Sequence, residues 1–228
     1  ENSIAHSSAD NPGPEVVCTW QGGEPTLLGI AYFEKIVALQ AKHAKPGRKV
    51  LNDLQTNGTR LDRDWCAFLK RHEFLVGLSI DGPAKLHDRF RVTKGGKPTH
   101  ARVMQSARLL QQYGIPYSAM CCVNRENAKH PLSVYRFLKR ELGATRIQFL
   151  PIVEPRDFRS TAPGMRAGRY FPRMGSERAR PGNQLSVVED WSVDPDDWGD
   201  FLIGVFDEWR AHDVGDVLVN WFENMVSQ

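Results

Sequence analysis

The sequence has 228 residues, of which 41% are hydrophobic and 25% charged, as is ordinary for a globular protein with one sizeable core. Its net charge of +3 is too small to indicate a nucleic-acid partner, and no apolar run is long enough to indicate a membrane span. The spacings of Cys18, Cys66, Cys121 and Cys122 match no zinc or disulfide pattern, which favours a reducing, cytoplasmic compartment. Adjacent Cys121 and Cys122 lie in a strand-like run and are predicted to pack as small hydrophobic side chains.

Short apolar runs alternate with helical patterns along the first two thirds of the chain. The predicted strands are 15–20, 48–54, 74–80, 115–123 and 146–152. The predicted helices are 30–43, 63–72, 99–113 and 132–142. This alternation predicts an α/β fold with a parallel sheet and right-handed crossovers.

The composition changes after Pro155. Seven arginines, with interspersed proline and glycine, occur between residues 156 and 182. They are compatible with a basic binding loop, but a solvated, partly disordered insertion is the favoured interpretation. An apolar stripe at helical spacing then predicts a helix from Asp194 to His212 that packs on the sheet, and 216–226 is one more short apolar element.

Polar residues gather where the predicted strands end. They are Gln21, Gly22, Gly23 and Glu24, then Gln55, Thr56, Asn57 and Gly58, then Ser79 and Asp81, then Asn124, and finally Gln148, Pro151 and Val153. Carboxyl ends of parallel strands share one edge, so these groups suit a small polar ligand with an ammonium and a carboxylate. Glu24 and the glycine carbonyls would accept from the ammonium, and Arg91 would pair with the carboxylate.

Each of these residues also has a purely structural interpretation. Asn57-Gly58 is a common turn pair, and Glu24 can cap the helix that follows it. Ser79 can be a small residue in a crowded core, and Arg91 a surface cation. His87 beside Asp88 can be a general acid/base pair, but a surface position is favoured for the histidine.

Four stretches together resemble the radical S-adenosylmethionine (SAM) superfamily, and within it the anaerobic sulfatase-maturating enzymes. They are TWQGGEPTLLG (19–29), LQTNGTRLDRDW (54–65), FLVGLSIDGPAKLHDRFR (74–91) and IQFLPIVEP (147–155), and FDEWRAHDVGDVLVNWFE (206–223) adds to them. The resemblance implies a partial (β/α)6 TIM-like barrel with a C-terminal helical extension. It also implies a [4Fe–4S] cluster that holds SAM and cleaves it to a 5′-deoxyadenosyl radical. That radical would begin the oxidation of a Cys or Ser of a sulfatase to formylglycine, with electrons from a donor such as flavodoxin or ferredoxin.

The resemblance also implies roles for individual residues. Gly23 would contact SAM, with Gly22 and Glu24 beside it at the methionine amino group. Ser79, Arg91 and Val153 match other SAM-contact positions, although a leucine is expected where Val153 stands. Gln21 and Asn57 would line the same cavity, near SAM or the substrate peptide.

The sequence departs from the family pattern in its cysteines. The family holds its cluster with a CxxxCxxC triplet upstream of GGEP, where this sequence has only Cys18. The cysteines of the family's C-terminal auxiliary-cluster domain are missing as well. We therefore expect a central fragment that does not perform the reaction alone. Its parts would be a partial barrel (1–155), an Arg/Pro/Gly-rich insertion (156–190) and a helical link (191–228).

Three alternatives remain open at this point. A related radical SAM maturase could modify a different peptide with the same barrel. A cluster-free barrel could bind SAM or a peptide without catalysis. A metal-dependent hydrolase could use Glu24, Asp81 and His87, although their spacing gives no metal-ligand signature.

Overall fold

The computed structural model describes residues 15–158, 160, 172–173 and 175–223. Its strands are β1 (Glu15–Trp20), β2 (Lys49–Thr56), β3 (Leu75–Ser79), β4 (Tyr117–Val123), β5 (Arg146–Pro151) and β6 (Leu218–Val219). Its α-helices are α2 (Ile30–His43), α3 (Arg63–Arg71), α4 (Ala84–His87), α5 (His100–Gln112), α6 (Pro131–Arg136) and α7 (Pro195–His212). Short 3-10 helices are η1 (Pro25–Leu28), η2 (Asn127–Lys129) and η6 (Glu177–Ala179), and η3 (Phe137–Glu141) is a π-helix.

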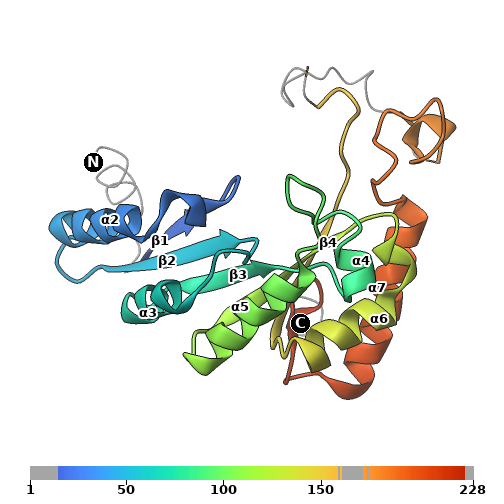
Figure 1. Cartoon of the computed structure of the whole chain (residues 1–228). Coiled ribbons are helices and arrows are strands. Elements are labelled where there is room, and N and C mark those ends of the chain that lie inside the picture. The colour runs from blue at the N-terminus through green and yellow to red at the C-terminus, as the bar shows by residue number, and fades with distance from the viewer. Residues whose placement is uncertain (1–14, 159, 161–171, 174, 224–228) are drawn as a thin grey trace. The chain divides into compact units, whose positions relative to one another are not determined.

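The strand order in the sheet is β1-β2-β3-β4-β5-β6, which is the order of the chain. The pairs β1–β2, β2–β3 and β5–β6 are parallel, and the β1–β2 register runs from Glu15 opposite Lys49 to Trp20 opposite Leu54. The expected α/β fold with parallel strands is therefore confirmed. The chain divides into two compact units. Figure 1 shows the elements coloured by residue number.

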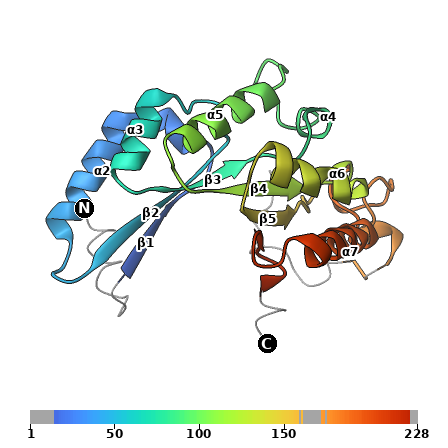
Figure 2. The same cartoon turned by 90° about the horizontal axis from the view of Figure 1, so that it is seen from below.

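Unit 1 comprises Glu1–Ser79 and Thr93–Ala119. Helices α2, α3 and α5 lie on one side of β1, β2 and β3 (Figure 2). Between them Phe33 is fully buried, with its ring centroid 5.7 Å from that of Trp20 and 5.6 Å from that of Trp65. These edge-on aromatic contacts fix helix α2 against the sheet.

A buried amide pair also joins α2 to β2. The side chains of Gln40 and Asn52 exchange two hydrogen bonds, of 2.8 and 3.0 Å, and the indole of Trp20 donates to the same Asn52 oxygen at 2.9 Å. Because buried amides are costly when unpaired, this network fixes the register of the helix on the strand.

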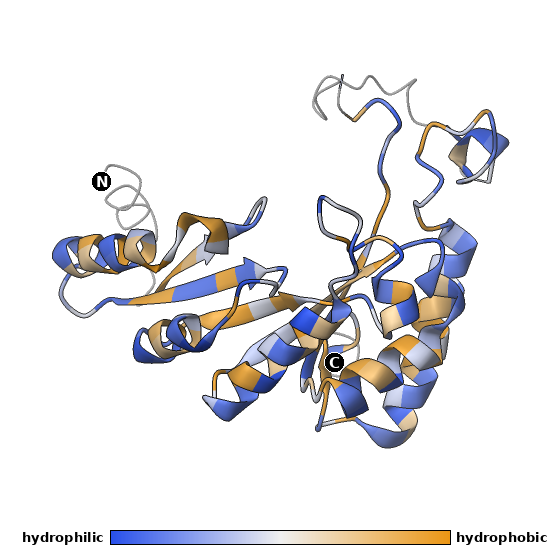
Figure 3. Ribbon diagram, in the orientation of Figure 1, coloured by the Kyte–Doolittle hydropathy of each residue, from blue (hydrophilic) through white to orange (hydrophobic). Residues whose placement is uncertain are grey.

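Unit 2 comprises Ile80–Val92 and Met120–Gln228. Helices α5 in unit 1 and α7 in unit 2 are both amphipathic, with hydrophilic and hydrophobic residues alternating along each ribbon (Figure 3). The predicted α7 stripe buries Phe201, Val205 and Trp209. The indole of Trp209 donates to the carbonyl of Val217 at 2.7 Å, which anchors the segment leading into β6. The short apolar element expected at 216–226 therefore contains a sixth strand.

The helix predicted over 132–142 is not regular throughout. It begins as α6 and continues as the π-helix η3, in which the N–H of Leu142 donates to the carbonyl of Phe137. The wider turn keeps Phe137 and Leu138 buried and places Lys139 against the buried carboxylate of Asp213. The other oxygen of Asp213 accepts a hydrogen bond from Tyr135 at 2.7 Å.

Residues 159, 161–171 and 174 of the arginine-rich segment expected at 156–182 lie outside the described residues. Within them, Arg156 pairs with Asp190 and Arg180 with Asp196, each at 2.9 Å. Among the helices of the described part of the chain, none combines the length and the apolar character that crossing a membrane requires.

Candidate SAM-binding site

Two glycines follow strand β1 and leave open space beside the backbone. Gly22 and Gly23 have φ angles of +96° and +52°, and a Cβ added at either position would meet no atom within 4 Å. Left-handed backbone disfavours other residues, so both positions favour glycine for conformational reasons. The open space is what a ligand would need to approach this turn.

Glu24 ties the end of β1 to the end of β2. Its Oε1 accepts from the N–H and hydroxyl of Thr26, at 3.1 and 2.5 Å, and from the hydroxyl of Thr56 at 2.7 Å. Its Oε2 accepts from the N–H of Asn57 at 2.7 Å. The capping interpretation is thereby confirmed, since Glu24 is the N-cap of η1.

All the donors that the structure gives Glu24 are neutral. Among the described residues no Lys, Arg or His forms an ion pair with its carboxylate, and its Oε2 accepts one bond where a carboxylate oxygen can accept two. A negative charge held only by neutral donors is suited to binding a cation.

The surroundings of the other candidate residues in unit 1 give weaker support for ligand binding. The side-chain oxygen of Asn57 accepts from the N–H and hydroxyl of Thr59, at 2.9 and 2.8 Å, so the turn interpretation of Asn57 is confirmed. Its backbone nevertheless contacts Glu24. Ser79 ends β3 and is buried, whereas Gln21 is exposed.

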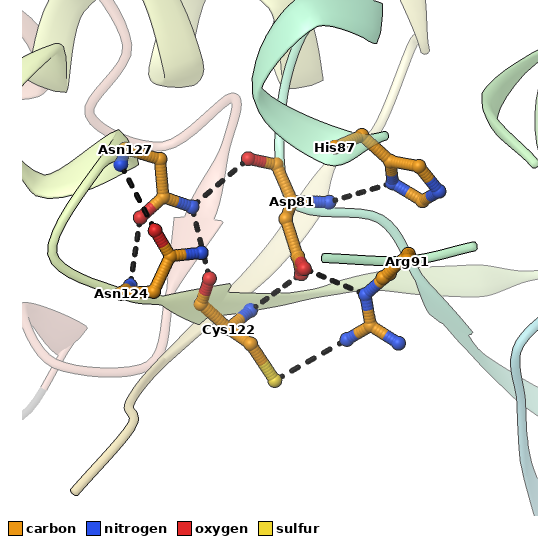
Figure 4. A network of polar contacts seen from close by, with 6 residues as sticks. All are labelled: Asp81, His87, Arg91, Cys122, Asn124 and Asn127. Carbon is orange, nitrogen blue, oxygen red and sulfur yellow. Dashed lines mark hydrogen bonds and ion pairs between the residues drawn. The ribbon is translucent and has the colours of Figure 1, made fainter. Parts of the chain in front are cut away.

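In unit 2, Asp81 is held by all four of its polar groups (Figure 4). Its N–H donates to Nδ1 of His87 at 3.2 Å, and its carbonyl accepts from Asn127 at 3.0 Å. Its Oδ1 accepts from the N–H of Cys122 at 2.9 Å, and its Oδ2 accepts from Nε of Arg91 at 2.6 Å. The residue after β3 is thus joined to α4, β4 and η2.

Arg91 is partly buried against this carboxylate. Its side chain is 25% exposed and that of Asp81 only 4%. Burial lowers the pKa of Arg91, but the charge and hydrogen bond of Asp81 raise it more, so the guanidinium stays protonated. Burial raises the pKa of the Asp81 carboxyl, against the opposing effect of Arg91. The interpretation of Arg91 as a simple surface cation is therefore wrong, because a buried partner holds it.

Cys122 is not only the small hydrophobic side chain that was expected. It is partly exposed, and its sulfur accepts a hydrogen bond from a terminal nitrogen of Arg91 at 3.3 Å. Burial raises the pKa of the Cys122 thiol, so the sulfur is a neutral acceptor. Its neighbour Cys121 is fully buried, as expected.

His87 is buried rather than at the surface, which corrects the favoured expectation. None of its area is exposed. Because its Nδ1 accepts the N–H of Asp81, that nitrogen carries no proton, and the imidazole helps to fix the turn after β3. Its contact with Asp81 shows a structural function that the proposed acid/base pair did not anticipate.

Sequence reasoning missed Asn127. It is fully buried, and its side-chain nitrogen donates to the carbonyls of both Asp81 and Cys122, at 3.0 and 2.9 Å. Its oxygen accepts from the N–H of Asn124 at 2.7 Å. Asn127 lies three residues beyond Asn124, and no local pattern in the sequence marks it.

Val153 follows β5 with its side chain 59% exposed. The backbone on either side is fixed: the N–H of Val193 donates to the carbonyl of Ile152 at 2.8 Å, and the N–H of Glu154 donates to the hydroxyl of Ser192 at 3.1 Å. An exposed apolar side chain on a fixed backbone suits contact with a flat apolar ligand surface.

The sequence model of the Radical SAM superfamily matches residues 6–138, which is more than half of the chain. The chain belongs to this superfamily.

Its similarity extends to anaerobic sulfatase-maturating enzymes. It is 38% identical over 214 residues to a serine-type enzyme of Bacteroides thetaiotaomicron, covering 94% of this chain and 48% of that protein. It is 40% identical over 136 residues to a cysteine-type enzyme of Clostridium perfringens, covering 60% of this chain and 36% of that protein. A solved structure of anSMEcpe with bound AdoMet and the Kp18Cys peptide matches with a TM-score of 0.80 and 29% identity, over 99% of this chain and 55% of that one. The chain thus spans about half the length of the curated relatives it matches.

The residues present fit SAM but not an iron–sulfur cluster. Glu24 offers a carboxylate without a cationic partner among the described residues, and the two glycines offer open backbone. The four cysteines lie in β1, α3 and β4 and are all free thiols. In the described part of the chain, no three His, Cys, Asp or Glu side chains come together to hold a metal ion.

Proposed function

We propose that this chain is the SAM-binding part of an enzyme that oxidises a Cys or Ser side chain of a sulfatase to formylglycine. The observation that carries the proposal is the similarity to sulfatase-maturating enzymes over nearly the whole chain, at 38% identity. When bound, SAM supplies the group that removes a hydrogen from the substrate. The substrate is a sulfatase polypeptide, and an electron donor such as flavodoxin or ferredoxin belongs to the same proposal.

The roles of the chain's own residues follow from their charges. Glu24 accepts hydrogen bonds from the ammonium of SAM, in addition to those that it accepts from Thr56 and Asn57. Gly22 and Gly23 leave the backbone beside Glu24 uncovered, so that the methionine end can approach. The residues that make these contacts all belong to unit 1.

In unit 2, Arg91 pairs with the carboxylate of SAM, since its guanidinium is protonated and a quarter of the side chain is exposed. Ser79 and Val153 contact other parts of SAM, and Gln21 and Asn57 line the cavity near SAM or the peptide.

Two measurements test the proposal. The full-length protein encoded by the gene is co-expressed anaerobically with a serine-type or a cysteine-type sulfatase, and the sulfatase peptide is analysed by mass spectrometry. The mass change of conversion to formylglycine, with reactivity toward a hydrazide probe, is the expected result. An unmodified sulfatase, or modification of a different peptide, would favour the alternative of another peptide maturase.

SAM binding is measured separately by calorimetry on the same protein. Glu24→Gln should weaken binding by about tenfold or more, because a charge-assisted hydrogen bond is lost. Lys35→Gln on α2 is the matched control, since it changes an exposed charge in unit 1 outside the proposed site. Unchanged affinity in Glu24→Gln would remove Glu24 from the site.

A further inference from the structure

We propose that Asp81 is a positioning residue that orients the guanidinium of Arg91 for binding the carboxylate of SAM; this rests on the proposed function of Arg91. Asp81 itself touches no ligand in this account. It acts through Arg91, and the remaining contacts of Asp81 hold it in place for that purpose.

Arg91 needs such support because of where it lies in the fold. It follows the short helix α4 in the segment Asp88–Val92, between α4 and α5, and not within a long helix or a strand. An arginine side chain has many rotamers, and ordering it during binding weakens affinity. A side chain that is already ordered in the free protein avoids this loss.

Two of the contacts of Arg91 bear directly on the orientation of its guanidinium. Oδ2 of Asp81 accepts from Nε at 2.6 Å, and the sulfur of Cys122 accepts from a terminal nitrogen at 3.3 Å. Figure 4 shows Asp81 and Cys122 along the same edge of the guanidinium, each joined to a different nitrogen. Because the guanidinium is planar, two contacts through different nitrogens fix both its place and its plane.

Asp81 can support Arg91 rigidly because it is buried and all of its polar groups are hydrogen-bonded. Its side chain is 4% exposed, and each of its four polar groups has a partner. Three of these partners, His87, Cys122 and Asn127, come from α4, β4 and η2; the first and last hold the backbone of Asp81, and the N–H of Cys122 holds its carboxylate. Asn127 contributes by holding the carbonyls of Asp81 and Cys122 together.

The negative charge of Asp81 and its proposed orienting role have opposite effects on SAM affinity, so the two can be distinguished by experiment. A negative charge beside Arg91 weakens the attraction of the guanidinium for another carboxylate. Removing the charge while keeping the shape, as in Asp81→Asn, therefore has two opposite effects. Binding weakens if orientation dominates and tightens if charge dominates.

The experiment is a double-mutant cycle in the full-length protein, with SAM affinity measured by calorimetry. Arg91→Met should weaken SAM binding by about ten- to a hundredfold. Asp81→Asn should weaken it by about three- to tenfold, and that effect should vanish when Arg91 is already Met. Glu126→Gln, in the loop after β4, is the matched control and should leave affinity unchanged.

A second ligand separates positioning from structural damage. Decarboxylated SAM lacks the group that Arg91 would bind, so Asp81→Asn should leave its affinity unchanged. Equal weakening for SAM and decarboxylated SAM would show a structural role and overturn the proposal, as would tighter SAM binding by Asp81→Asn.

The outcomes distinguish this inference from the proposed function. If Arg91→Met leaves SAM affinity unchanged, the assignment of Arg91 fails first. If Arg91→Met weakens binding but Asp81→Asn has no effect or acts additively, only the positioning role fails. Should Asp81→Asn not fold, Cys122→Ala keeps the test: it removes the second contact and should weaken SAM binding by about twofold without affecting decarboxylated SAM.

Discussion

Glu24 in unit 1 and Asp81 in unit 2 are both carboxylates placed shortly after a strand, and both join that strand end to another element. Among the described residues, the partners of the Glu24 carboxylate are hydroxyls and backbone N–H groups. Asp81 is more deeply buried and has a guanidinium as a partner. The same kind of side chain is thus held by neutral donors at one strand end and by a guanidinium at the other.

This difference in hydrogen-bond partners indicates which group at each strand end is able to bind a ligand. At Glu24 the donors around the carboxylate are neutral, which suits it to accept from a cation. At Asp81 the carboxylate is neutralised, and the exposed portion of the pair belongs to Arg91.

Removing Asp81 should have the largest effect on stability. Asp81→Ala leaves the buried end of Arg91 and the N–H of Cys122 without this acceptor. We expect a loss of about 3–5 kcal/mol in the free energy of unfolding, measured by urea denaturation. A loss below about 1 kcal/mol would show that the ion pair does not hold unit 2 together, and the contrast with Glu24 would disappear.

Removing Glu24 should lower stability less than removing Asp81 does, but it should weaken ligand binding more. Glu24→Ala takes away an N-cap and a link to β2, for an expected loss of about 1–2 kcal/mol in unfolding free energy. SAM affinity should fall by about tenfold or more. Thr56→Val is a useful companion, because it removes one donor to Glu24 and keeps the carboxylate. A Glu24→Ala protein less stable than Asp81→Ala would reverse the comparison.

Gly23→Ala tests whether SAM approaches the open backbone at Gly23. A Cβ at this position meets nothing, so only the left-handed φ of +52° costs stability, about 1–2 kcal/mol. Gly96→Ala is the matched control, with a φ of +74° and equally open space. Both variants should lose similar stability in thermal melts, but only Gly23→Ala should weaken SAM binding. Equal SAM affinities would argue against close approach at Gly23.

The smallest effect is expected at an ion pair near the surface, which serves as a reference for both carboxylates. Arg136 on α6 donates to both oxygens of Glu208 on α7, at 2.8 and 2.9 Å, and its side chain is 46% exposed. The hydrogen bond from Arg136 lowers the pKa of Glu208 below its ordinary value of 4.5.

Because the folded-state pKa is the lower one, this pair stabilises the fold above pH 4.5 and the contribution is lost as pH falls through the folded-state pKa. The small difference in melting temperature between the protein and Arg136→Gln should therefore shrink in acid. A difference that grows in acid would contradict the assigned shift.

Much of the fold could be predicted from local patterns. Runs such as Val16-Val17-Cys18 and Leu75–Ser79 are short and apolar, and they do form strands. The helix over 132–142 was predicted as regular, and its π-helical part, in which Lys139 contacts Asp213 74 residues away, has no mark in the local pattern. The division at residues 155 and 190 stays a prediction.

The candidate site residues stay predictions, but the structure shows partners for them that the sequence could not indicate. Glu24 and Arg91 stood out because they follow predicted strands. The sequence could not show that Asp81 holds Arg91 through contacts with Cys122 and Asn127, which lie 41 and 46 residues further along the chain. Burial of His87 and exposure of Cys122 were missed for the same reason, since burial depends on contacts distant in sequence.

The most direct test of the central claim compares SAM with an analogue that lacks its ammonium group, binding to the protein and to Glu24→Gln. The account predicts that the unaltered protein strongly prefers SAM and that Glu24→Gln loses most of this preference, with little change in affinity for the deaminated analogue. If Glu24→Gln weakens both ligands equally, Glu24 only holds the strand ends together, and the claim that it receives the ammonium of SAM is contradicted.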